Sequence, residues 1–175
     1  PYGILYNNTG IRQTRTTPTL TNTRVRNSAE STRTELLVGV SLSGYTGIDI
    51  DNCDIEDYPV GINFNNTGIR ELATPTLTNT RVRNSAESVR EGTVGIVFTG
   101  YVAADLFECD IEEFVTGIDY QGDGQPFPLG RSTPTLTNTR LRNSAESVRV
   151  GALGLNLMNL HDINISGCDV DGFDT

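Results

Sequence analysis

One segment of fifteen residues occurs three times in this chain, and this repetition limits the possible folds more than any other feature. The segment TPTLTNTRVRNSAES occupies residues 17–31 and recurs unchanged at residues 74–88. A third copy, at residues 133–147, differs only by Leu141 in place of valine. The copies are offset by 57 and 59 residues. Self-similarity at a fixed period of this length is typical of solenoids, in which each repeat packs against its neighbours.

Each long repeat contains two unequal copies of a smaller unit. Residues 48–58, IDIDNCDIEDY, match the pattern of residues 75–85, PTLTNTRVRNS, so that Asn52 aligns with Asn79. Glycines mark the starts of the six units, at Gly3, Gly39, Gly61, Gly95, Gly117 and Gly154. Short units of 22 residues therefore alternate with long units of 34 to 37 residues, which gives a long repeat of about 58 residues.

Every unit contains three short stretches in which apolar and polar residues alternate, such as GINF, PTLT and TRVRN. Alternation with a period of two is typical of β-strands, and Asn, Gly, Ser and Pro separate the stretches. No segment has a helical period. We therefore predict an all-β chain of six coils in a single domain, residues 1–175, with long repeats at about 3–60, 61–116 and 117–175.

The pattern of one unit resembles a known architecture. GVSLSGYTGIDIDNCDI, residues 39–55, has a glycine at the start, alternating apolar positions and an asparagine between the second and third strands. In this it resembles the right-handed parallel β-helix repeat proteins of the pectate-lyase-like superfamily, and the resemblance covers the whole chain. It implies a right-handed solenoid and a secreted or cell-surface protein. It does not imply one activity, because such folds host many.

Equivalent residues of successive coils should form columns, because stacked strands lie about 4.8 Å apart. Four columns, which begin at Ile4, Tyr6, Leu20 and Val25, are apolar and should form the core. Two further columns carry charges whose sign alternates at every coil. The first reads Arg24, Asp54, Arg81, Asp110, Arg140 and Asp169, and the second reads Arg26, Glu56, Arg83, Glu112, Arg142 and Asp171. We predict a ladder of ion pairs on the outward, exposed face that fixes the register of the strands.

Two other columns have a predicted structural role. Asparagines recur at the corner after the second strand, at Asn22, Asn52, Asn79 and Asn138, with Glu108 and Gly167 in the remaining coils. Asparagine tolerates the left-handed backbone that a tight corner needs. Cys53, Cys109 and Cys168 share the next column and lie two coils apart, about 9.6 Å by the strand spacing. Since a disulfide needs Cα atoms within about 7 Å, we predict three free thiols.

The chain offers little for catalysis or cofactor binding. All 13 basic residues are arginine against 22 acids, a net charge of −9 that disfavours nucleic-acid binding. No run of 18 apolar residues could span a membrane. His161 is the only histidine, and the acids recur as ladder members, so we expect no enzyme and no cofactor. The weak calcium candidate is Asp119, Gln121 and Asp123, but position twelve of that loop is Gly130 instead of glutamate.

These features lead to the expectation of a structural segment of a long secreted or cell-surface β-helical protein, such as a fibre, stalk or adhesin. The chain begins at Pro1, which suggests a processed product or a fragment. Its partners would be copies of itself or further repeats stacked head to tail, with Asp169 and Asp171 meeting Arg24 and Arg26. The alternative is a polysaccharide-binding or polysaccharide-degrading β-helix, in which the long loops or the arginine face would bind surface glycans.

Overall fold

A computed structural model describes most of the chain. The described residues are 2–7, 17–27, 37–44, 47–67, 72–85, 92–122, 133–144, 151–160 and 162–173. They contain eighteen strands and no helix. The strands form three sheets of six, and every pairing between neighbours is parallel. The predicted all-β class and the parallel stacking of repeated units are therefore confirmed.

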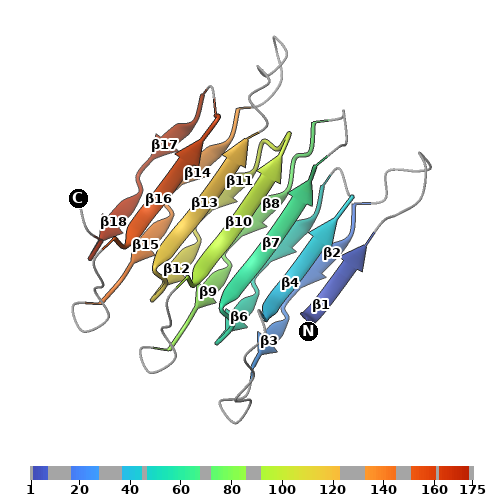
Figure 1. The fold of residues 1–175 in the computed structure, drawn as a ribbon. Helices are drawn as coiled ribbons and strands as arrows, with labels where there is room; N and C mark the ends of the chain where they lie inside the picture. The colour runs from blue at the N-terminus through green and yellow to red at the C-terminus, as the bar shows by residue number, and fades with distance from the viewer. Residues whose placement is uncertain are drawn as a thin grey trace.

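Each sheet takes every third strand of the chain (Figure 1). The first sheet contains β1 (Tyr2–Asn7), β4 (Val38–Ser43), β7 (Val60–Asn66), β10 (Val94–Gly100), β13 (Thr116–Gly122) and β16 (Leu153–Met158). The second contains β2 (Thr19–Thr21), β5 (Asp49–Asp51), β8 (Thr76–Thr78), β11 (Asp105–Phe107), β14 (Thr135–Thr137) and β17 (Asn164–Ser166). The third contains β3 (Arg24–Arg26), β6 (Asp54–Glu56), β9 (Arg81–Arg83), β12 (Asp110–Glu112), β15 (Arg140–Arg142) and β18 (Asp169–Asp171).

Three consecutive strands make one coil, and the six coils stack from β1–β3 to β16–β18. In Figure 1 the long strands of the first sheet lie in front, and the short strands of the other two sheets lie behind them. The colour changes steadily along the stack, so each coil lies beside the coils that precede and follow it in sequence. Three parallel sheets of six strands stacked in register are consistent with a parallel β-helix.

The core fills the space between the sheets with the predicted apolar columns. In the third coil Ile62, Phe64, Leu77 and Val82 are each at most 1% exposed. Strands from all three sheets supply these side chains, so burying them holds the sheets together. At about 1.5–3 kcal/mol for each large apolar side chain, the columns dominate the stability of the stack.

Aromatic rings continue one core column across three coils. The ring centroids of Phe64 and Phe98 are 6.5 Å apart, and those of Phe98 and Tyr120 are 5.2 Å apart. The buried hydroxyl of Tyr120 donates a hydrogen bond of 2.5 Å to the carbonyl oxygen of Val102. A tyrosine is tolerated inside this core because its one polar atom is paired there.

The glycine column is required by close packing between coils. A Cβ atom on Gly61 would lie 2.2 Å from Cγ1 of Val82 and 2.5 Å from the carbonyl oxygen of Gly95. Real Cβ atoms do not approach other atoms so closely, so only glycine fits. Each short coil has an aromatic residue four positions after the start of its third strand. One of these, Phe114, also packs against the glycine column, 3.1 Å from the Cβ position of Gly95.

Candidate functional site

The alternating charges of the third sheet lie in register along the whole stack. The first column pairs Arg24, Asp54, Arg81, Asp110, Arg140 and Asp169 in that order, and the second pairs Arg26, Glu56, Arg83, Glu112, Arg142 and Asp171. We call these twelve residues the ladder. Each arginine therefore has a carboxylate in every coil directly beside it, which is the favourable arrangement for neighbouring strands.

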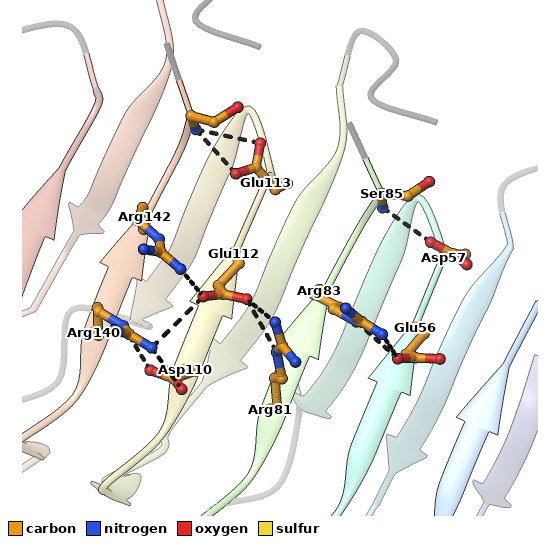
Figure 2. Close-up of polar contacts among 11 residues, drawn as sticks. Glu56, Asp57, Arg81, Arg83, Ser85, Asp110, Glu112, Glu113, Arg140 and Arg142 are labelled. Atoms are coloured by element: carbon orange, nitrogen blue, oxygen red, sulfur yellow. Dashed lines mark hydrogen bonds and ion pairs between the residues drawn. The ribbon is translucent and has the colours of Figure 1, made fainter. Parts of the chain in front are cut away.

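Glu112 is the centre of one group of ladder residues. It is 5% exposed, and it accepts hydrogen bonds from two arginines on opposite sides (Figure 2). Its Oε2 accepts from Nε of Arg81 at 3.0 Å and from Nη2 at 2.6 Å, and its Oε1 accepts from Nη2 of Arg142 at 2.6 Å. Arg81 lies in the coil before Glu112 and Arg142 in the coil after it, so one carboxylate links three coils.

Glu56 repeats this arrangement one long repeat earlier. It is 1% exposed, and its Oε2 accepts from Nε of Arg24 at 2.9 Å and from Nη2 at 2.5 Å. Its other oxygen accepts hydrogen bonds from Arg83. Charged hydrogen bonds of this kind are shorter and stronger than neutral ones, and they offset the cost of burying the carboxylate.

The aspartates of the first column differ from each other. Arg140 donates to both oxygens of Asp110, from Nε at 2.9 Å and from Nη2 at 3.0 Å. Asp54 occupies the equivalent position, but among the described residues its only ion pair is a distant one, 3.9 Å from Nε of Arg24. Its Oδ1 atom is buried and has no hydrogen-bond partner. Arg81, which is in register with Asp54, is instead bound to Glu112.

These contacts shift the pKa values of the carboxyl groups in opposite directions. Burial alone would raise the pKa of Glu112, but the hydrogen bonds from Arg81 and Arg142 outweigh it and lower the pKa below its ordinary value. The pKa of Glu56 is lowered in the same way, by Arg24 and Arg83. Burial raises the pKa of Asp54, and the neighbouring charge of Glu56 raises it further.

The ladder differs from the sequence-based expectation in two respects. We expected arginines and carboxylates to pair within a column, but Arg24 and Arg81 cross diagonally to glutamates of the other column. We also expected an exposed face, whereas Glu56 and Glu112 are buried beneath their arginines. Both differences have one physical reason. The glutamate side chain is long enough to reach the guanidinium of a neighbouring coil, and that guanidinium then covers the carboxylate.

Two acidic residues with a clear role were missed by the sequence analysis. Asp57 and Glu113 follow the third strand of short coils and have left-handed backbone angles, with φ of 62° and 65°. The backbone N–H of Ser85 donates to Oδ1 of Asp57 at 2.9 Å, and that of Ser144 donates to Oε1 of Glu113 at 3.0 Å (Figure 2). Each acid thus anchors the chain just after the third strand of the following long coil. The signal in the sequence was an acid at this position in the first two short coils, where the long coils have asparagine and the last short coil has Gly172.

The corner residues all adopt the left-handed backbone. The φ angles are 50° for Asn22, 50° for Asn52, 47° for Asn79, 53° for Glu108, 49° for Asn138 and 64° for Gly167. The side chains also contact each other, since Nδ2 of Asn52 donates to Oδ1 of Asn22 at 2.5 Å. These corners join the second sheet to the third and present the ladder strands in register.

The three cysteines lie in one column on the inner side of the corners, and all are free thiols. Cys53 and Cys109 are buried, and Cys168 is half-buried. Sγ of Cys109 donates to the carbonyl oxygen of Leu77 at 3.4 Å, as the hydroxyl of Thr80 does to that of Thr78 at 3.0 Å. Burial raises the pKa of Cys109 to about 11. A buried thiol with this pKa is a packing residue with little nucleophilic character.

The calcium candidate is engaged in contacts of its own. Oδ2 of Asp119 accepts from Nε2 of Gln121 at 2.7 Å, and Oδ1 accepts from Nδ2 of Asn156 at 2.9 Å. Asp123 and His161 lie outside the described residues. Within the described ranges, no group of three or more His, Cys, Asp or Glu side chains is placed to hold a metal ion.

Comparison with protein-family models, with curated proteins and with solved structures found no match. In the part of the chain that the structure describes, no helix is long and apolar enough to cross a membrane.

Proposed function

We propose that this chain is a structural segment of a right-handed parallel β-helix of the pectate-lyase-like architecture, serving as part of a fibre, stalk or adhesin outside the cell or on its surface. The observation that carries this proposal is the ladder. Glu112 binds arginines of the coils on both sides, and Glu56 does the same one repeat earlier. Contacts that join the first five coils to one another serve to hold a long stack in register.

The path of the chain supports a right-handed winding. In Figure 1 the chain rises along β1, returns behind it through β2 and β3, and then reaches β4 at the side toward the C-terminal end. Connections between parallel strands of one sheet are also almost always right-handed.

The last coil supports the further proposal that the stack continues end to end. Its core side chains remain open, with Leu157 40%, Ile165 51% and Val170 53% exposed. Their counterparts in the first coil are better covered, with Leu20 7% and Val25 8% exposed. Another coil placed on β16–β18 would bury the open columns and pair the strand edges. That coil would come from a further repeat of the same chain or from a second copy.

The contacts of the arginines favour a structural role over glycan binding. In the ladder each arginine has a carboxylate in register in a neighbouring coil, and Arg81, Arg83 and Arg140 donate through Nε and Nη2 together. A surface whose cations already face carboxylates attracts an acidic polysaccharide weakly.

Electron microscopy of the purified 175-residue chain tests the proposal. We expect rods whose lengths increase in steps of about 29 Å, the height of six stacked coils at the strand spacing. A chain that stays monomeric at high concentration would contradict non-covalent stacking. Submicromolar binding on a glycan array, or cleavage of a polysaccharide, would favour the alternative function.

A further inference from the structure

We infer that Asp169 and Asp171 form a docking site for Arg24 and Arg26 of a second copy, and that this site sets the direction of assembly. The inference rests on the proposed end-to-end stacking and adds the residues and the polarity of the contact. It commits to one occupant, the first coil of another chain, on grounds of charge complementarity and strand register.

The carboxylates of the last coil are uncommitted. Asp169 and Asp171 are exposed, and among the described residues neither side chain forms an ion pair. The arginines in register with them turn the other way, since Arg140 binds Asp110 and Arg142 binds Glu112. The ladder therefore ends in two free negative charges beside the open apolar columns.

The first coil carries the complementary charges, and of its two arginines Arg26 is the less engaged, because Arg24 already donates to Glu56 from Nε at 2.9 Å and from Nη2 at 2.5 Å. Within the stack, arginines of later long coils donate back to the carboxylates of the preceding short coil, as Arg83 does to Glu56 and Arg142 does to Glu112. Arg26 lies in the first coil that the structure describes, and among the described residues it makes only longer ion pairs, 3.4 Å to Oδ2 of Asp57 and 3.7 Å to Oε2 of Glu56. Its side chain is 59% exposed.

A second copy in the same register would complete both sets of contacts. Its first coil would place Arg26 beside Asp171, as Arg83 lies beside Glu56, and Arg24 beside Asp169. The same register would set the exposed Leu157 of the last coil against the half-buried Tyr6 of the new coil, whereas Leu20 and Val25 of the first coil are already buried. The exposed apolar side chains of the last coil supply one side of the contact, and the charges supply the register.

The charges also select one polarity. Two last coils brought together would place aspartates against aspartates, and two first coils would place arginines against arginines, and both arrangements repel. Only a last coil against a first coil pairs opposite charges. Such a head-to-tail contact uses different surfaces on the two chains and, when the rotation does not close, it produces a filament.

The decisive variant is Asp169→Arg with Asp171→Arg, which changes two exposed side chains without ion-pair partners. Its last coil would repel the first coil of any copy, so the variant alone should form no rods. Its own first coil is unchanged and should still dock on wild-type chains, where it stops growth. When one chain in ten is the variant, wild-type rods should shorten to about ten chains, because each variant ends one rod.

The matched control is Asp49→Arg with Asp51→Arg, which makes the same change of charge on the second sheet, in the second coil. This control should form rods and should leave wild-type rods unshortened. A third variant, Asp171→Glu, should strengthen assembly, because it gives the last coil the longer acid that Glu56 and Glu112 supply in the other short coils. It should lower the protein concentration needed for rods about fivefold. Urea unfolding checks that each variant is folded.

The outcomes separate the two proposals. Rods formed by Asp169→Arg/Asp171→Arg alone, or wild-type rods that it does not shorten, would overturn the docking site while leaving end-to-end stacking intact. The absence of rods from the wild-type chain itself would overturn both stacking and the docking site. Shortening by the variant and not by the control would establish the acidic pair as the site.

Discussion

Arg140 holds both carboxylate oxygens of Asp110, with Nε at 2.9 Å from one and Nη2 at 3.0 Å from the other. Arg81 occupies the same place one long repeat earlier, but it reaches forward to Glu112 and leaves Asp54 behind. Two copies of a segment that differ only by Leu141 in place of Val82 thus make different contacts. The difference originates in the coil that follows each of them.

The length of one side chain accounts for the two behaviours. The coil after Arg81 offers Glu112 as the diagonal acceptor, whereas the coil after Arg140 offers Asp171, which is shorter by one methylene group. Without a carboxylate within reach ahead, Arg140 turns back to Asp110. Arg81 leaves Asp54 because Glu112 is within its reach, and Arg140 stays with Asp110 because no glutamate follows it in the next coil.

Asp54→Asn and Asp110→Asn should therefore change stability in opposite directions. The first removes a carboxylate whose buried oxygen is unpaired and whose charge is close to Glu56. We expect the free energy of unfolding to rise by up to about 1 kcal/mol. The second breaks a half-exposed pair with Arg140 and should lower it by about 0.5–1 kcal/mol. Urea titration at pH 7 measures both, and equal destabilisation would contradict the different pairing of the two aspartates.

Glu112→Gln should reduce both the stability and its dependence on acid. The pKa of Glu112 is lowered in the folded protein, so its charge stabilises the fold above the ordinary pKa of about 4.3, and this contribution is lost as the pH falls below that value. Removing the buried charge from between two arginines should cost about 2–4 kcal/mol at pH 7.

The difference between wild type and Glu112→Gln should shrink as the pH is lowered from 5 toward 3, the range below the ordinary glutamate pKa. Unfolding measured at several pH values provides the comparison. Glu108→Gln, at an exposed corner without an ion pair among the described residues, is the control and should follow the wild type. A constant difference at all pH values would show that the arginines do not act on the charge of Glu112.

The three cysteines should react at different rates in the folded protein. Cys109 is buried and its pKa is raised to about 11, so little thiolate is present and reagents have poor access. At pH 8 we expect the half-buried Cys168 to be alkylated at least about tenfold faster. Mass spectrometry of peptides gives the rates. In denaturant without reductant three thiols should titrate, and a lower number would indicate disulfides that the structure does not contain.

Gly61→Ala should disrupt the packing between coils. The added methyl would lie 2.2 Å from a methyl of Val82 and 2.5 Å from a backbone oxygen, and the backbone oxygen cannot move away by rotation of a side chain. We expect a loss of about 3 kcal/mol. Gly47→Ala is the control, because the nearest atom to its added methyl would be the carbonyl oxygen of Thr74 at 3.3 Å, and it should cost less than about 1 kcal/mol. Thermal unfolding of both variants decides the comparison.

The sequence alone determined the columns of this protein. The fifteen-residue segment and its fainter copies assign Arg24, Arg81 and Arg140 to one column, and the corner asparagines to another. This worked because a strand has a strict period of two and a slip of one residue would turn its apolar face outward. Repetition then carries one register along the whole stack.

The tertiary structure decided how the side chains of these columns meet. No pattern in the sequence indicated that Arg81 would cross to Glu112, that Glu56 would be buried, or that Asp57 would anchor Ser85. The backbone register is set by the apolar face, but a charged side chain chooses among several acceptors in neighbouring coils. That choice depends on distances across the sheet and on the length of each acid, and these exist only when the coils are stacked.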